Sequence, residues 1–174
     1  MISVCLATYN GELFLKEQLT SILKQLGDSD EVVVSDDGST DLTLTILQEF
    51  NDPRIKVFHH DKRKQKCSFD YATYNFENAI NNSSGDVIFF SDQDDIWLDG
   101  KVATFMNALA DCDLVLSDCI VVDSQLNELY SSYFKLNKSR TGIFYNLINN
   151  SYLGCCMAFK RSLLDKSAAM PFPK

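Results

Sequence analysis

The 174-residue sequence has no long hydrophobic run, no CxxC pair and no excess of positive charge. No stretch approaches the roughly 18 apolar residues of a membrane-spanning helix, and no basic flank precedes the first apolar stretch, as a signal peptide requires. The 16 Lys and Arg are outnumbered by 24 Asp and Glu, which gives a formal charge of −8. A field of that sign repels a phosphate backbone, so nucleic acid is not an expected partner.

The six cysteines lack the spacing of metal ligands. With 45% apolar residues, the chain has enough core to fold without disulfide bonds. We therefore interpret the cysteines as reduced thiols of a cytoplasmic protein and not as a structural zinc site. His59 and His60 are adjacent, with no Cys or His at ligand spacing, so they are interpreted as a surface pair.

Strand-like and helix-like apolar patterns alternate along the chain, without a repeat or a linker, and the length suits one domain. We predict strands over 2–8, 31–35, 55–58, 87–90, 114–116 and 120–122, helices over 15–26, 42–50, 71–81, 101–109 and 161–168, and an apolar run over 152–159. Such alternation forms βαβ units. It predicts an α/β fold whose mostly parallel central sheet is covered on both faces.

An acidic loop, Ser91-Asp92-Gln93-Asp94-Asp95, follows the predicted strand over 87–90. Three carboxylates in four positions are costly unless a cation neutralises them, and hard divalent cations take oxygen ligands. The loop therefore indicates either a Mn²⁺ or Mg²⁺ site that bridges a diphosphate, or an acidic connection that caps a helix.

A second polar loop, Asp36 to Asp41, ends the predicted strand over 31–35. A carboxylate there can accept the imide N–H of a uracil or thymine ring, on which Tyr9 could stack. The alternative is that Asp36 and Asp41 only cap helices. Because ligands bind at the carboxyl edge of parallel strands, both acidic loops lie where a ligand is expected.

Three ordered motifs, Leu6 to Gly11, Val34 to Asp41 and Phe90 to Trp97, resemble those of family-2 glycosyltransferases of GT-A fold. The resemblance extends from Ile2 to about Leu164 and is strongest to bacterial rhamnosyltransferase-type enzymes of surface-polysaccharide synthesis. It implies a Rossmann-like three-layer sandwich. It also implies metal-dependent, inverting transfer from a UDP-sugar or dTDP-sugar to a saccharide or lipid-linked saccharide, with peripheral association at the inner face of the membrane.

The same resemblance implies which residues contact the nucleotide. Ala7, Thr8 and Tyr9 would border the base, Asp37 would bind it, and residues 75–79 resemble the helix beneath the donor site.

The resemblance further makes Asp92 and Asp94 the two acids of a DxD motif, with Asp94 on Mn²⁺ or Mg²⁺ and Asp92 near both the ribose and the metal. Asp95 is a neighbour that could assist. Trp97, Gly154 and Cys155 are candidates for contact with the sugar or the acceptor, and a packing role for Trp97 is equally open.

Two departures from the family pattern concern the diphosphate and the general base. A longer basic loop makes Lys62 and Arg63 candidates for the diphosphate, against the alternative of a solvated face. In the family an acid after the Gly154-like segment acts as base, and Asp165, the only late acid, lies in a predicted helix.

We therefore expect residues 1–174 to be a single nucleotide-sugar-binding domain, truncated at its C-terminus, with the general base beyond Lys174. A nucleotide-sugar-binding module without transferase activity is the alternative function. A receiver-type signalling domain would need its acid pair after the first strand, where Thr8-Tyr9-Asn10 stands instead.

Overall fold

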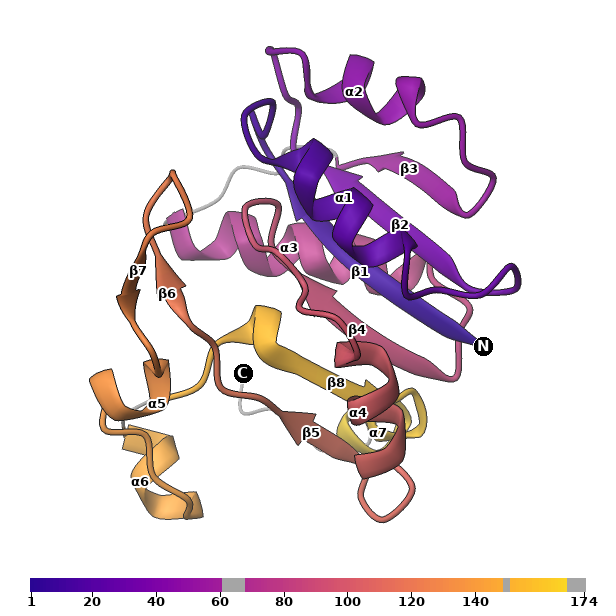
Figure 1. The fold of residues 1–174 in the computed structure, drawn as a ribbon. Coiled ribbons are helices and arrows are strands. Elements are labelled where there is room, and N and C mark those ends of the chain that lie inside the picture. The colour runs from indigo at the N-terminus through magenta and orange to yellow at the C-terminus, as the bar shows by residue number, and fades with distance from the viewer. Residues whose placement is uncertain (61–67, 149–150, 169–174) are drawn as a thin grey trace.

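The computed structural model describes residues 1–60, 68–148 and 151–168, in which helices cover both faces of a central sheet (Figure 1). Along the chain the elements are β1 (Ile2–Thr8), α1 (Leu15–Leu23), β2 (Glu31–Asp36), α2 (Thr43–Glu49), β3 (Ile55–His59), α3 (Ser68–Asn81), β4 (Val87–Ser91), α4 (Lys101–Ala108), β5 (Leu114–Leu116), β6 (Val121–Val122), β7 (Glu128–Tyr130), α5 (Tyr133–Leu136), α6 (Ile143–Ile148), η1 (Gly154–Cys156), β8 (Met157–Lys160) and α7 (Ser162–Ala168).

The central sheet has the strand order β3-β2-β1-β4-β8-β5. The strands β1 to β4 are parallel to one another, which confirms the predicted mostly parallel sheet. The apolar run over 152–159 supplies most of β8, which is antiparallel to both β4 and β5. The sequence pattern does not indicate whether this run pairs parallel or antiparallel with its neighbours.

Alternating side chains of the sheet build two separate cores. In β1, Val4 and Leu6 face the core formed with α1, α2 and α4, whereas Cys5 faces the core formed with α3 and α7. The predicted cover on both faces, and with it the three-layer arrangement, is confirmed.

A small outlying part follows β5; its strand β6 matches the predicted strand over 120–122, whereas β7, α5 and α6 were predicted only as irregular chain. The strands β6 and β7 form an antiparallel pair, and the short helices α5 and α6 lie next to it, apart from the central sheet (Figure 1). Asp118 fixes the start of α5, because its carboxylate accepts hydrogen bonds from Ser132 Oγ at 2.5 Å and Phe134 N at 2.9 Å.

The connections place both acidic loops at one edge of the sheet. From β1 the chain adds β2 and β3 on one side and then crosses to add β4 on the other. In the ladder Thr8 lies opposite Asp36, and Leu6 lies opposite Ser91. The carboxyl ends of β1, β2 and β4 therefore meet at the point where the strand order reverses, which is where open α/β sheets bind ligands.

At the opposite edge, Glu31 joins three segments of the chain. Its side chain is 3% exposed and accepts hydrogen bonds from Ser3 Oγ, Ser84 N and Lys56 Nζ, each at 2.6 Å. Burial by itself raises the pKa of Glu31, but these hydrogen bonds outweigh it and lower the pKa to about 2.

We expect Glu31→Gln to lower the free energy of unfolding by about 2 kcal/mol at pH 7. A carboxylate whose folded pKa lies below its unfolded value stabilises the fold above the unfolded pKa of about 4.3, and that contribution is lost as the pH falls toward 2. In urea unfolding, the stability difference between the wild type and Glu31→Gln should therefore be smaller at pH 3 than at pH 7. The control, Glu49→Gln at an exposed position, should change the stability little at either pH. An equal difference at both pH values would contradict an ionic contribution.

Candidate active site

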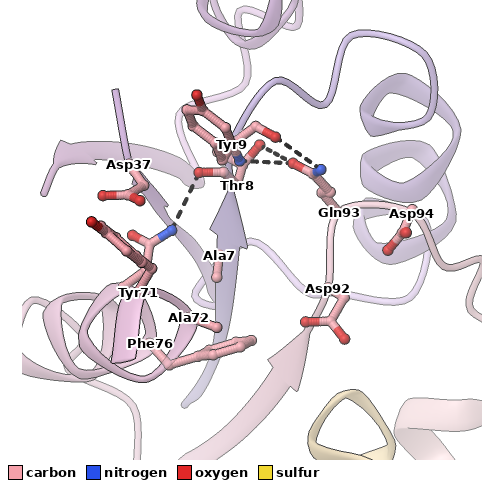
Figure 2. A pocket seen from close by; sticks show the side chains of 11 residues that line it. Ala7, Thr8, Tyr9, Asp37, Tyr71, Ala72, Phe76, Asp92, Gln93 and Asp94 are labelled. Carbon is pink, nitrogen blue, oxygen red and sulfur yellow. Dashed lines mark hydrogen bonds between the residues drawn. The ribbon is translucent and has the colours of Figure 1, made fainter. Parts of the chain in front are cut away.

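A pocket of about 700 Å³ opens at the carboxyl edge of β1, β2 and β4 (Figure 2). Its lining includes all six residues that the sequence assigned to the nucleotide and the metal: Ala7, Thr8, Tyr9, Asp37, Asp92 and Asp94. Helix α3 adds Tyr71, Asn75 and Phe76. Figure 2 shows Asp37 and Tyr71 on one side of the pocket and the acidic loop on the other.

On the α3 side, Asn75 is 4% exposed. Its Nδ2 atom donates a hydrogen bond to Thr8 O at 3.2 Å, and its buried Oδ1 has no partner among the described residues. Asn75 therefore ties α3 to the end of β1, beneath the pocket.

The loop after β2 separates the roles of its acids. The Asp36 carboxylate accepts hydrogen bonds from Gly38 N and Ser39 N, both at 3.0 Å, so it is held by its own turn. Asp41 accepts from Thr43 N at 3.0 Å at the start of α2. The local structural role therefore fits Asp36 and Asp41, and Asp37 is the acid that lines the pocket.

Sequence interpretation was wrong about His60. His59 is 70% exposed, but the His60 side chain is only 8% exposed, and its Nδ1 atom lies 3.0 Å from Asp37 Oδ1. The two histidines differ because β3 pairs with β2 and sets His59 opposite Asp36, which brings the next residue beside Asp37. The contact between His60 and Asp37 depends on how two strands pair, and strand pairing carries no local sequence signal.

Gln93, the middle residue of the acidic loop, was not singled out from the sequence. Its Oε1 accepts hydrogen bonds from Thr8 Oγ1 at 2.7 Å and Tyr9 N at 2.8 Å, and its Nε2 donates to Tyr9 O at 3.1 Å (Figure 2). One side chain thus binds the loop after β4 to the loop after β1.

Gly11 leaves room for this contact, and Gly11→Ala is expected to break it. A Cβ at position 11 would lie 2.5 Å from Gln93 Oε1 and 3.1 Å from Thr8 Oγ1. Displacing Gln93 should weaken nucleoside diphosphate binding at least ~10-fold, as for other residues that orient ligand-binding groups. Isothermal titration with UDP measures it. The control is Gly27→Ala, whose nearest contact would be an ordinary 3.5 Å. Unchanged affinity in Gly11→Ala would refute a positioning role for Gln93.

Asp92 and Asp95 form an acidic cluster with Cys155, in which one ligand atom from each lies within 4.8 Å of the others. Burial and the neighbouring Asp95 raise the pKa of Asp92 to about 6, and burial also raises the pKa of Asp95. The nearby Lys101 is itself buried, which lowers its pKa. The carboxylates therefore lack full neutralisation and fit a hard divalent cation, whereas a thiol is a ligand for softer metals.

The third acid of the loop occupies a different position. Asp94 is exposed and lines the pocket, and it lies outside the cluster with Cys155. Asp92 belongs to both groups. The structure thus offers Asp94 and Asp95 as alternative partners of Asp92 around an ion.

The three candidates for sugar or acceptor contact do not line the pocket. Trp97 is 2% exposed and packs against Phe89, with 5.4 Å between ring centroids, so its packing interpretation fits and its contact interpretation does not. Gly154 is exposed, and Cys155 is buried beside the acidic cluster.

Lys62 and Arg63 lie outside the described residues, so their predicted contact with a diphosphate stays a prediction. Asp165 is exposed on α7, next to Lys166, which pairs with Asp113 at 2.8 Å. Because Asp113 precedes β5 at the amino edge of the sheet, Asp165 lies at the edge opposite the pocket. This position argues against Asp165 as the base.

Comparison with known proteins gives a match over almost the whole chain to the family described as "Glycosyl transferase family 2", which aligns with residues 3–167. A dTDP-rhamnosyl transferase, RfbG, from Shigella flexneri is 38% identical over 107 residues, which are 60% of this chain and 36% of that protein.

The Escherichia coli enzyme WfgD, named UDP-Glc:alpha-D-GlcNAc-diphosphoundecaprenol beta-1,3-glucosyltransferase, is 28% identical over 99% of this chain and 63% of its own length. The chain thus spans less than two thirds of either relative.

Among solved structures, the mannosyltransferase PcManGT from Pyrobaculum calidifontis, in complex with GDP-Man and Mn²⁺, superposes with a TM-score of 0.65. Its sequence is 24% identical, and the match covers 98% of this chain and 47% of that one. The likeness confirms the expected GT-A architecture. Within the described residues, no helix has the length and apolar character needed to cross a membrane.

Proposed function

Because the chain belongs to glycosyl transferase family 2, we propose that it is the nucleotide-sugar-binding domain of a metal-dependent, inverting glycosyltransferase. The enzyme moves a sugar from a UDP-sugar or dTDP-sugar to a saccharide or lipid-linked saccharide in cell-surface polysaccharide synthesis. It works in the cytoplasm, at the inner face of the membrane. The names of the Shigella and E. coli relatives support the pyrimidine nucleotides, and the E. coli name supports a lipid-linked acceptor.

One observation supports this proposal: a pocket at the reversal point of the strand order is lined by Asp37 at one side and by Asp92 and Asp94 of the acidic loop at the other. That layout matches the two ends of a nucleoside diphosphate. At the base end, Tyr9 stacks on the ring and Asp37 accepts the imide N–H. At the diphosphate end, Asp92 together with Asp94 or Asp95 would hold Mn²⁺ or Mg²⁺, an ion that when bound neutralises the departing diphosphate.

The carboxylates that line the pocket all serve the donor in this scheme. Asp37 binds the base, and Asp92 and Asp94 face the diphosphate. We place the general base that takes the proton of the acceptor hydroxyl after Lys174. Because no described pocket acid is left for that role, a nucleotide-sugar-binding module without transferase activity is the second candidate function. Measuring sugar transfer by a longer chain that extends beyond Lys174 separates the transferase from the binding module.

A thermal-shift panel of UDP, dTDP, GDP and CDP, each with and without Mn²⁺, tests the proposal directly. A ligand that binds only the native state raises its melting temperature by mass action. We expect UDP or dTDP to raise it, and Mn²⁺ to enlarge the shift. If none of the four nucleotides shifts the melting temperature with Mn²⁺ present, the proposed function is wrong.

Asp37→Ala should weaken binding of UDP or dTDP by about 1.5 to 3 kcal/mol, the usual value of a hydrogen bond to a charged group. It should also remove the preference over CDP, whose ring N3 carries no hydrogen. Competition titrations with UDP and CDP measure both effects, and the exposed Asp28→Ala is the control. The same UDP to CDP ratio before and after the substitution would remove Asp37 from the base site.

A further inference from the structure

The Asp37 carboxylate is held from outside the pocket by one imidazole. The two side chains are only 8% exposed for His60 and 10% for Asp37, and 3.0 Å separates Nδ1 from Oδ1. An ionised carboxylate only accepts hydrogen bonds, so His60 donates the Nδ1 hydrogen. Within the described residues, this hydrogen bond restrains the Asp37 side chain.

Backbone hydrogen bonds hold both partners in place. His60 N donates to Asp36 O at 2.8 Å, which extends the ladder between β2 and β3, and Asp37 N donates to Thr8 O at 3.0 Å. The pairing of β1, β2 and β3 therefore places His60 beside Asp37. Since Oδ1 already accepts one hydrogen bond, Oδ2 is the stronger acceptor for a ligand among the contacts of the described residues.

The number of free oxygens matters because nucleobases differ in the number of N–H groups they present. Uracil and thymine offer one imide N–H between two carbonyl groups. Guanine offers N1–H and N2–H₂ side by side, a pair that binds both oxygens of a free carboxylate in the bidentate manner of a planar fork. A carboxylate in which one oxygen already accepts a hydrogen bond binds a second donor at that oxygen less strongly, so it favours the single donor over the pair.

We propose that His60 is a positioning residue that makes Asp37 selective for uracil or thymine over guanine by donating a hydrogen bond to one of its two carboxylate oxygens. This inference rests on the proposed function, because it concerns the base of the same nucleotide. It adds a specificity determinant that directly follows β3 and lies outside the motifs that carry the family resemblance.

Isothermal titration with UDP and with GDP, each with Mn²⁺, tests the inference on four proteins: the wild type, His60→Phe, His60→Asn and His59→Phe. Phenylalanine keeps the buried ring and removes the donor. Asparagine places its amide nitrogen where Nδ1 stands, so it rescues the hydrogen bond. His59→Phe makes the same change at the exposed neighbour.

We expect the wild type to prefer UDP over GDP, and His60→Phe to reduce the affinity ratio at least ~10-fold, the value of about one charged hydrogen bond. The ratio in His60→Asn should stay within about threefold of the wild type, and His59→Phe should leave it unchanged. A purely structural role would lower both affinities together and leave the ratio intact. Circular dichroism checks folding, and if His60→Phe does not fold, His60→Gln, whose amide stands one bond farther from Cβ, carries the same expectation.

An unchanged ratio in the folded His60 variant overturns the inference, as does a wild type that binds UDP and GDP equally well. Neither result touches the proposed function, because UDP still binds. If the wild type binds no nucleoside diphosphate with Mn²⁺, the proposed function and the role of His60 are both wrong.

Discussion

Asp94→Asn is expected to weaken Mn²⁺-dependent binding of UDP or dTDP at least ~100-fold, more than the loss of a supporting residue in a metal site. The amide keeps the shape of the side chain but removes the charge that a hard cation requires. Because Asp94 is exposed in a loop, the fold should be unaffected. Isothermal titration of UDP with and without Mn²⁺ gives the effect, and circular dichroism verifies the fold.

The same titration on Asp95→Asn decides between the two arrangements around Asp92. If Asp94 is the ligand, Asp95→Asn should retain most of the Mn²⁺ effect on UDP binding. If the cluster with Cys155 holds the ion, Asp95→Asn should lose the Mn²⁺ effect and Asp94→Asn should retain most of it. Asp99→Asn, an exposed acid beyond the loop, is the control. Undiminished affinity in a folded Asp94→Asn protein would remove Asp94 from the metal site.

Gly85→Ala is expected to lower the free energy of unfolding by about 3 kcal/mol. A Cβ at this position would lie 2.6 Å from Ser3 N and 2.8 Å from Ile2 C, so the backbone of β1 would have to move. Gly85 also donates its N–H to Ser3 Oγ at 2.7 Å and accepts from Arg161 Nε at 2.6 Å. The shift would therefore disturb β1, β4 and the start of α7 together.

Urea denaturation of Gly85→Ala and Gly154→Ala measures this loss against a matched control. Position 154 has open space around an added Cβ, so its substitution should change stability by less than about 0.5 kcal/mol. If Gly85→Ala is as stable as the wild type, the close approach between β1 and the chain before β4 is wrong.

The parallel half of the sheet could be predicted from sequence because β1, β2 and β4 are continuous apolar runs between turn residues. The strand β6 was predicted, but its partner β7 could not be, since the residues of β7 are all exposed and show no alternation that marks a strand. The direction of β8 was also beyond prediction. An apolar pattern shows that a strand is buried but not which neighbour it pairs with.

The same division applies to the site. Asp37, Asp92 and Asp94 stand at strand ends, where a local motif already indicates a ligand, and all three line the pocket. His60 and Gln93 act on residues 23 and 84 positions away, so no local pattern reveals them. Their roles arise from the order of strands in the sheet, which only the three-dimensional structure supplies.

The three hydrogen bonds of Gln93 couple the two ends of the pocket thermodynamically. The Gln93 side chain connects the loop proposed to hold the ion to the residues proposed to border the base, so a change in one of these segments acts on the other. Two ligands that each tighten one loop then assist one another, and linkage requires the assistance to be equal in both directions. The coupling would therefore be the same whether the nucleotide or the cation binds first.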